Sequence, residues 1–108
     1  MKIARLILTV SLILATPLFG APINQEQFSK LMKLHCVSCH GPDKQKGRFR
    51  IDTIDLNKLD VTQADRLSDA VDLLNDQKMP PEEKSKLSPD SRLQLVELLA
   101  KALNEFYV

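Results

Sequence analysis

Apolar residues recur at helical spacing in three stretches of the chain, and each stretch begins beside a residue that can cap a helix. The first stretch runs from about Asn24 to His35, with Asn24 as the N-cap and Gln27 three residues on, as in a capping box. Its inward positions follow the i, i+3, i+4, i+7 spacing: Phe28, Leu31, Met32 and His35. This pattern predicts an amphipathic helix.

Two further helices are predicted in the second half of the chain. One runs from Gln63 to Asn75 and is capped by Thr62, with an apolar face made of Ala64, Leu67, Val71 and Leu74. The other begins at Ser88-Pro89, a capping serine followed by proline at the first helical position, and continues to about Phe106. Its inward positions are Leu95, Leu98, Leu99, Ala102 and Phe106. No strand pattern is present, so we expect one all-α domain.

The N-terminus has the order of a secretory signal peptide. Lys2 and Arg5 precede an apolar stretch, which ends in small residues near Gly20 and Ala21. The 16 residues from Leu6 to Ala21 fall short of the roughly 20 apolar residues of a spanning helix. We therefore expect residues 1–21 to be cleaved and residues 22–108 to form the mature domain, in the periplasm or otherwise exported.

Charge excludes two classes of partner for the exported chain. Of the 15 basic residues, Lys2 and Arg5 leave with the signal peptide, so 13 remain against 14 acidic residues. A nearly neutral protein of this kind is not suited to nucleic acid or to an anionic membrane surface. We expect a monomer that binds neither nucleic acid nor a membrane surface.

Both cysteines of the chain fall in one five-residue motif. Cys36, Cys39 and His40 form the pattern C-x-x-C-H, through which a c-type haem is attached to a protein. The two thiols can bond to the two vinyl groups of the porphyrin, and the following histidine can ligate the iron. A covalent haem would also supply apolar surface to a small domain with few aromatic residues.

Two other readings of the cysteine pair remain open. A zinc knuckle needs four ligands, usually with a second cluster further along the chain, and His35 is the only other histidine. A thioredoxin-like dithiol belongs in a βαβ context, whereas the residues around Cys36 read as helix. Both readings fit the sequence less well than covalent haem.

The sixth ligand of a haem iron would decide between an electron carrier and an open site. Met79 lies 39 residues after His40, in the sequence Lys78-Met79-Pro80-Pro81 between two predicted helices. Two successive prolines stiffen this segment, which can present a thioether from the side opposite His40. Met32 is instead expected in the core. His35 lies on the proximal segment, so we expect it to be partly packed or at the surface.

In order and motif the chain resembles the class I c-type cytochromes, and more narrowly the planctomycete-type cytochrome c domain. The likeness covers roughly residues 26–106 and depends on CHGPDKQKG (39–47), FRID (49–52) and MPP (79–81). The chain departs from the family at Arg48, where a second glycine is frequent. The resemblance implies a class I cytochrome c fold, with three main helices packed around one haem, and His40 and Met79 as axial ligands.

The expected function is single-electron transfer between a redox donor and an acceptor, without enzymatic activity. Alternatives are a haem sensor or peroxidase-like module with an open sixth position, and the front module of a larger redox enzyme. Haem propionates need hydrogen-bonding partners where they are partly buried. Arg50, between apolar Phe49 and Ile51, is the first candidate and Arg48 the second; a solvated face of basic residues is the alternative for both.

Overall fold

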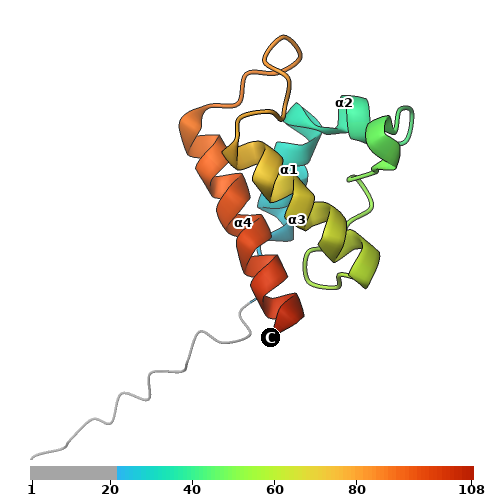
Figure 1. Cartoon of the computed structure of the whole chain (residues 1–108), viewed down its shortest axis with the longest axis vertical. Helices are drawn as coiled ribbons and strands as arrows, with labels where there is room; N and C mark the ends of the chain where they lie inside the picture. Colours follow the sequence, from blue (N-terminus) through green and yellow to red (C-terminus); the bar gives the residue numbers. More distant parts are fainter. Residues whose placement is uncertain (1–21) are drawn as a thin grey trace, which may run out of the picture.

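The computed structural model describes residues 22–108. Along the chain it forms α1 (Gln25–His35), α2 (Val37–His40), the short 3-10 helix η1 (Lys46–Arg48), α3 (Val61–Asn75) and α4 (Pro89–Tyr107) (Figure 1). Over residues 22–108 the only extended pairing is an isolated bridge between His40 and Gln45. The all-helical prediction is therefore confirmed for this part of the chain. The signal peptide predicted over residues 1–21 lies outside the described residues and stays a prediction.

The caps of α1 and α4 follow from the sequence. Asn24 Oδ1 accepts a hydrogen bond from the backbone N–H of Gln27 at 3.0 Å, and Ser88 Oγ accepts one from that of Ser91 at 3.1 Å. These bonds satisfy donors that have no partner within the helix. The side chain of Gln27 bonds to Gln94 of α4 at 3.1 Å, so it does not complete the capping box expected at α1.

The cap of α3 differs from the prediction. Asp60, not Thr62, is the N-cap, and the helix begins two residues earlier than expected. Asp60 Oδ1 accepts from the N–H of Gln63 at 2.7 Å, and Gln63 Oε1 accepts from the N–H of Asp60 at 3.2 Å. This reciprocal pair satisfies two backbone donors at once, which explains why the helix starts there.

The core lies where α1, α3 and α4 meet. α3 and α4 run side by side (Figure 1), and α1 packs against α4. The buried residues that form the main apolar cluster are Ile23, Phe28, Leu31, Met32, Ile51, Ile54, Leu56, Leu67, Leu74, Leu95, Leu99 and Ala102. Leu98, Phe106 and Val71 were expected to face inward, but they are only half-buried. Leu98 packs against the edge of the cluster.

The loop between α2 and α3 contributes three buried residues that periodicity did not reveal. Ile51, Ile54 and Leu56 are at most 5% exposed. Gln25, in the first turn of α1, holds this loop with both ends of its amide. Its Nε2 donates to the Ile54 carbonyl at 2.8 Å, and its Oε1 accepts from the N–H of Leu56 at 2.8 Å. The loop is thus a wall of the core.

No helix among residues 22–108 has the length and apolar character needed to cross a membrane.

The burial pattern predicts a graded response to truncation. Leu67 is fully buried in α3, so Leu67→Ala should lower the free energy of unfolding by about 2–5 kcal/mol because it leaves a cavity. Leu98→Ala should cost less, because Leu98 is half-buried. Leu93, which is 57% exposed, provides the control, and Leu93→Ala should change little. Denaturant unfolding of the three variants measures the order, and an equal cost for Leu67 and Leu93 would contradict this packing.

Candidate haem site

The cysteine-histidine motif occupies a single helical turn after a break in the chain. α1 ends at His35, and Cys36 adopts φ −125° and ψ −38° before α2 begins. The carbonyl of Cys36 accepts from the N–H groups of Cys39 at 3.1 Å and His40 at 2.9 Å. Residues three and four apart lie on the same face of a helix. Both thiols and the imidazole are therefore brought to one side of the backbone.

The imidazole of His40 is held by the loop that follows. Its Nδ1 lies 3.2 Å from the carbonyl oxygen of Phe49. A carbonyl only accepts hydrogen bonds, so Nδ1 carries the proton and Nε2 has a free lone pair. This is the arrangement in which a histidine ligates a metal while its other nitrogen donates to a second group. The ring of Phe49 packs on the imidazole, with centroids 5.4 Å apart.

Gly41 lets the chain turn closely after His40. Its N–H donates to the Lys44 carbonyl at 2.8 Å, and its Cα faces the backbone and side chain of Val37 so closely that a Cβ would overlap both. Five residues after Gly41, η1 begins and brings the chain back, and the N–H of Ile51 donates to the His40 carbonyl at 2.8 Å. His40 is thus fixed through both its backbone and its ring.

The basic loop turns at two successive residues in the left-handed region, Gly47 and Arg48. Gly47 and Arg48 both have positive φ, of 65° and 56°. Glycine adopts this region freely, whereas other residues incur a cost of roughly 1–2 kcal/mol. A family preference for a second glycine has a physical reason here, and Arg48 adopts the same left-handed conformation.

A mainly apolar cavity of about 330 Å³ joins the motif to Met79. This volume lies within the range of about 300–1,000 Å³ that is typical of ligand sites. Its walls come from α1, α2, η1, α3, α4 and the loop after α3, and include Met32, Cys36, Cys39, His40, Phe49, Ile51, Leu73, Leu74, Met79, Pro80, Pro81, Leu95 and Leu99. In Figure 1 the loop between α3 and α4 lies at the same end of the molecule as α2. His40 and Met79, which are 39 positions apart in the sequence, thus line the same cavity.

Cys36 and Cys39 are not joined to each other by a disulfide bond. Burial raises the pKa of the Cys36 thiol to about 11, and the neighbouring Cys39 adds to the shift. Cys36 therefore stays protonated at neutral pH, whereas the thiolate is the form that attacks disulfides. This property does not suit a dithiol redox catalyst. Over the described residues 22–108, no group of three or more His, Cys, Asp or Glu side chains is placed to hold a metal ion, as a zinc knuckle requires.

Met32 and His35 lie where the sequence predicted. Met32 is 2% exposed and belongs to the core. His35 is half-buried at the cavity and bonds to Ser85 Oγ at 2.5 Å, which links α1 to the loop after Met79.

Arg50 lies apart from the cavity walls. Its guanidinium donates to both carboxylate oxygens of Asp52, at 2.8 and 3.0 Å. This bond lowers the pKa of Asp52. The pair is exposed, so it contributes little to stability. The propionate role of Arg50 stays a prediction, and three cations that sequence reasoning did not select line the cavity itself: Lys46, Arg66 and Lys84.

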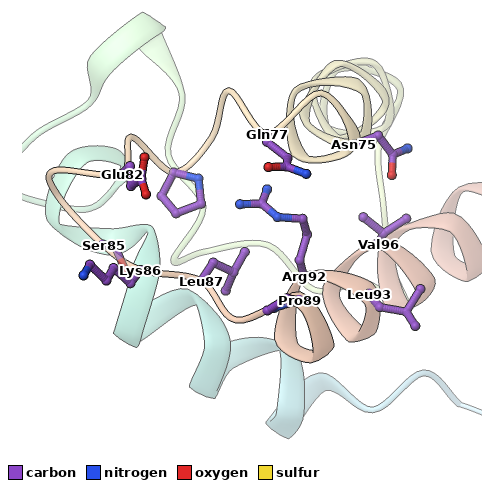
Figure 2. Close-up of a pocket in the computed structure, with 11 residues that line it drawn as sticks. Asn75, Gln77, Glu82, Ser85, Lys86, Leu87, Pro89, Arg92, Leu93 and Val96 are labelled. Carbon is purple, nitrogen blue, oxygen red and sulfur yellow. The ribbon is translucent and has the colours of Figure 1, made fainter.

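A second cavity of about 530 Å³ lies between α4 and the loop that follows α3. Figure 2 shows Arg92 of α4 at its centre, close to Gln77. Neither cysteine nor His40 lines it. Pro80 lines both cavities, so the second cavity lies beside the candidate haem site.

Comparison with known proteins supports the reading of the first cavity as a haem site. Residues 36–83 match the model of a family described as planctomycete cytochrome C, which confirms the resemblance inferred from the motifs. The matched segment includes Cys36, Cys39, His40 and Met79. Over this segment the chain is similar to the planctomycete cytochrome C family, and a family of this kind implies covalent haem. Neither a curated protein nor a solved structure matches significantly.

The close contact at Gly41 makes a prediction about the site. Gly41→Ala should lower the free energy of unfolding by about 1–3 kcal/mol, because the new methyl group overlaps Val37 and the backbone must shift. The exposed Asp43 lies in the same turn, so Asp43→Ala serves as the control and should be close to neutral. Denaturant unfolding measures both. Equal stability of the two variants would show that the turn can accommodate a side chain.

Proposed function

We propose that this protein is an exported c-type cytochrome that carries single electrons, with thioether bonds at Cys36 and Cys39 and ligation of the iron by His40 and Met79. The observation that supports it is that these four residues line one mainly apolar cavity. When bound there, haem supplies an iron that changes its charge by one electron. Export is inferred from the signal-peptide pattern of residues 1–21.

Each side chain has a distinct role in this proposal. Cys36 and Cys39 bind the porphyrin edge, and the hydrogen bond from Nδ1 to the Phe49 carbonyl directs Nε2 of His40 toward the ligand position. The thioether of Met79 is a soft ligand, which favours the ferrous state and so raises the reduction potential.

The cavity walls support electron transfer without large rearrangement. Met32, Leu74, Leu95 and Leu99 line the cavity and are also buried in the core. Packed interiors of this kind exclude water and deform little. The walls would therefore hold the axial ligands in similar positions in both oxidation states.

Charged residues at the cavity give candidates for the anionic propionates. Lys46, Arg66 and Lys84 are exposed, yet line the cavity, so they can approach a carboxylate without losing all their water. We place them beside Arg50 as candidates. A redox donor and an acceptor would approach the cavity where such exposed side chains reach the surface.

The proposal has two competitors. In a haem sensor or peroxidase-like module, Met79 would not ligate the iron. In the front module of a larger redox enzyme, the same ligation would serve transfer to an attached domain. Ligation of the iron by Met79 distinguishes the electron carrier from the sensor or peroxidase-like module. Electron exchange between the exported protein and a separate partner distinguishes it from the front module of a larger enzyme.

Covalent attachment is the first test. Expressed with a c-type maturation system, the protein should retain haem after acid-acetone extraction and denaturation, because thioether bonds resist both. Cys36→Ala or Cys39→Ala should leave at most one thioether, and His40→Ala should lose the low-spin spectrum. Visible spectra of the denatured protein and its mass measure the outcome. A colourless protein that contains zinc would contradict the proposal.

Ligation by Met79 is the second test. The ferric protein should have the weak sulfur-to-iron charge-transfer band at the red edge of the visible spectrum, and the ferrous protein should resist carbon monoxide. Met79→Ala should open the sixth position, admit carbon monoxide and lower the reduction potential, because the soft ligand is lost.

Met32→Leu is the matched control for Met79→Ala. It replaces a core thioether by an apolar side chain of similar volume, so the band and the potential should stay close to those of the wild type. A wild-type protein that lacks the band and binds carbon monoxide readily would favour the sensor or peroxidase-like reading.

A further inference from the structure

The direction of the chain at Met79 is set by the end of α3. The N–H of Gln77 donates to the Leu74 carbonyl at 3.1 Å, and the N–H of Lys78 donates to the Leu73 carbonyl at 2.9 Å. Gln77 has a positive φ of 58°. These two bonds and the left-handed residue define a Schellman motif. Met79 is the next residue, so the motif fixes the point from which its side chain starts.

Beyond Met79 the backbone offers few anchoring groups. Pro80 and Pro81 have no N–H, so the segment can be held there only through its carbonyls. The Pro81 carbonyl accepts from the N–H groups of Lys84 at 2.9 Å and Ser85 at 3.1 Å, which lie within the same loop. The N–H of Met79 donates to the Leu73 carbonyl of α3 at 3.3 Å, and Ser85 further along the loop bonds to His35 of α1. Between these two points, the Met79 carbonyl is the group that α4 can bind.

Arg92 of α4 binds that carbonyl. Its Nη1 donates to the Met79 carbonyl at 2.8 Å and to the Leu74 carbonyl at 2.8 Å. Figure 2 shows its side chain reaching from α4 toward the loop beside Gln77. Arg92 is half-buried, and its N–H bonds to the Ser88 carbonyl at 2.9 Å, so its backbone is part of the regular helix. Hydrogen bonds from a charged donor are stronger than neutral ones.

A cation is also suited to this position. The Leu74 carbonyl lies in the last turn of α3, where the helix dipole is negative. The guanidinium therefore joins the end of α3 to Met79 and supplies the opposite charge there. It does so from the second cavity, since Arg92 lines that cavity and not the one that holds Cys36 and His40.

We propose that Arg92 is a positioning residue of the haem site, whose bridge between the carbonyls of Leu74 and Met79 holds the Met79 thioether at the iron. This inference rests on the proposed ligation by Met79. Arg92 lies behind the loop, so its influence on the iron passes through Met79.

The test uses the exported, haem-loaded protein and free imidazole as a competing ligand for the ferric iron. Arg92→Met removes the donors while keeping an apolar stem, so the loop should open more often. The apparent affinity for imidazole should rise by roughly ten- to a hundredfold, the effect of losing a hydrogen bond to a charged group. The sulfur-to-iron band should weaken in parallel. Arg92→Lys keeps the charge with a different donor geometry and should give a smaller rise.

Lys86→Met is the matched control. Lys86 lines the same cavity as Arg92 and is exposed, and its substitution removes the same charge. Its imidazole affinity should stay within about twofold of the wild type, because no bond to the Met79 segment is lost. If Arg92→Met fails to fold or retain haem, Arg92→Lys takes its place against the same control.

A second measurement separates positioning from general destabilisation. In the Met79→Ala background, Arg92→Met should leave the imidazole affinity unchanged, because there is no thioether left to position. An equal rise in both backgrounds would overturn the inference. The inference would also be overturned if the Arg92 variants had the same imidazole affinity as Lys86→Met while the wild type keeps the sulfur-to-iron band. A wild type that lacks the band and binds imidazole as readily as Met79→Ala would instead refute the proposed ligation itself, and the inference with it.

Discussion

The fold and the candidate site share the same apolar side chains, because part of the hydrophobic core forms the wall of the candidate haem cavity. Met32 from α1, Leu74 from α3, and Leu95 and Leu99 from α4 are buried against one another and also line the cavity of Cys36, His40 and Met79. A domain of this size buries limited apolar surface by itself. Packing of the helices and formation of the site are therefore the same event, and a large apolar group fixed at Cys36 and Cys39 would stabilise both.

Backbone strain is concentrated beside the two segments that carry the proposed ligands. Within residues 22–108, the non-glycine residues with positive φ are Arg48 and Gln77. Arg48 directly precedes Phe49, whose carbonyl accepts from His40, and Gln77 lies two residues before Met79. Residues held in such conformations persist only where the surroundings over-determine them. The surroundings are identifiable here: the bond between His40 and Phe49 in one case, and the Schellman bonds with the Arg92 bridge in the other.

Much of the fold and the centre of the site could be predicted from sequence, because each depends on local signals. Helical periodicity and the caps Asn24 and Ser88 located α1 and α4, and the C-x-x-C-H motif identified the cavity wall. Ile51, Ile54 and Leu56 were missed because loop residues have no repeating spacing. The half-burial of Leu98 depends on how α4 rotates against its neighbours, which periodicity defines only to within a residue. Asp60 was missed as a cap because Thr62 is also a good cap residue.

Arg92 was missed for a different physical reason. Its partners are two backbone carbonyls, and every residue has a carbonyl, so no side-chain pattern in the sequence signals the bond. Met79 can be recognised as a possible ligand from its neighbours Pro80 and Pro81, but those prolines also remove the N–H groups that would anchor it. The same sequence feature that stiffens the segment thus gives a donor from another helix, Arg92, a larger share in holding its position. If Met79 ligates the iron as proposed, the packing of α3 against α4 helps to decide whether its thioether stays there.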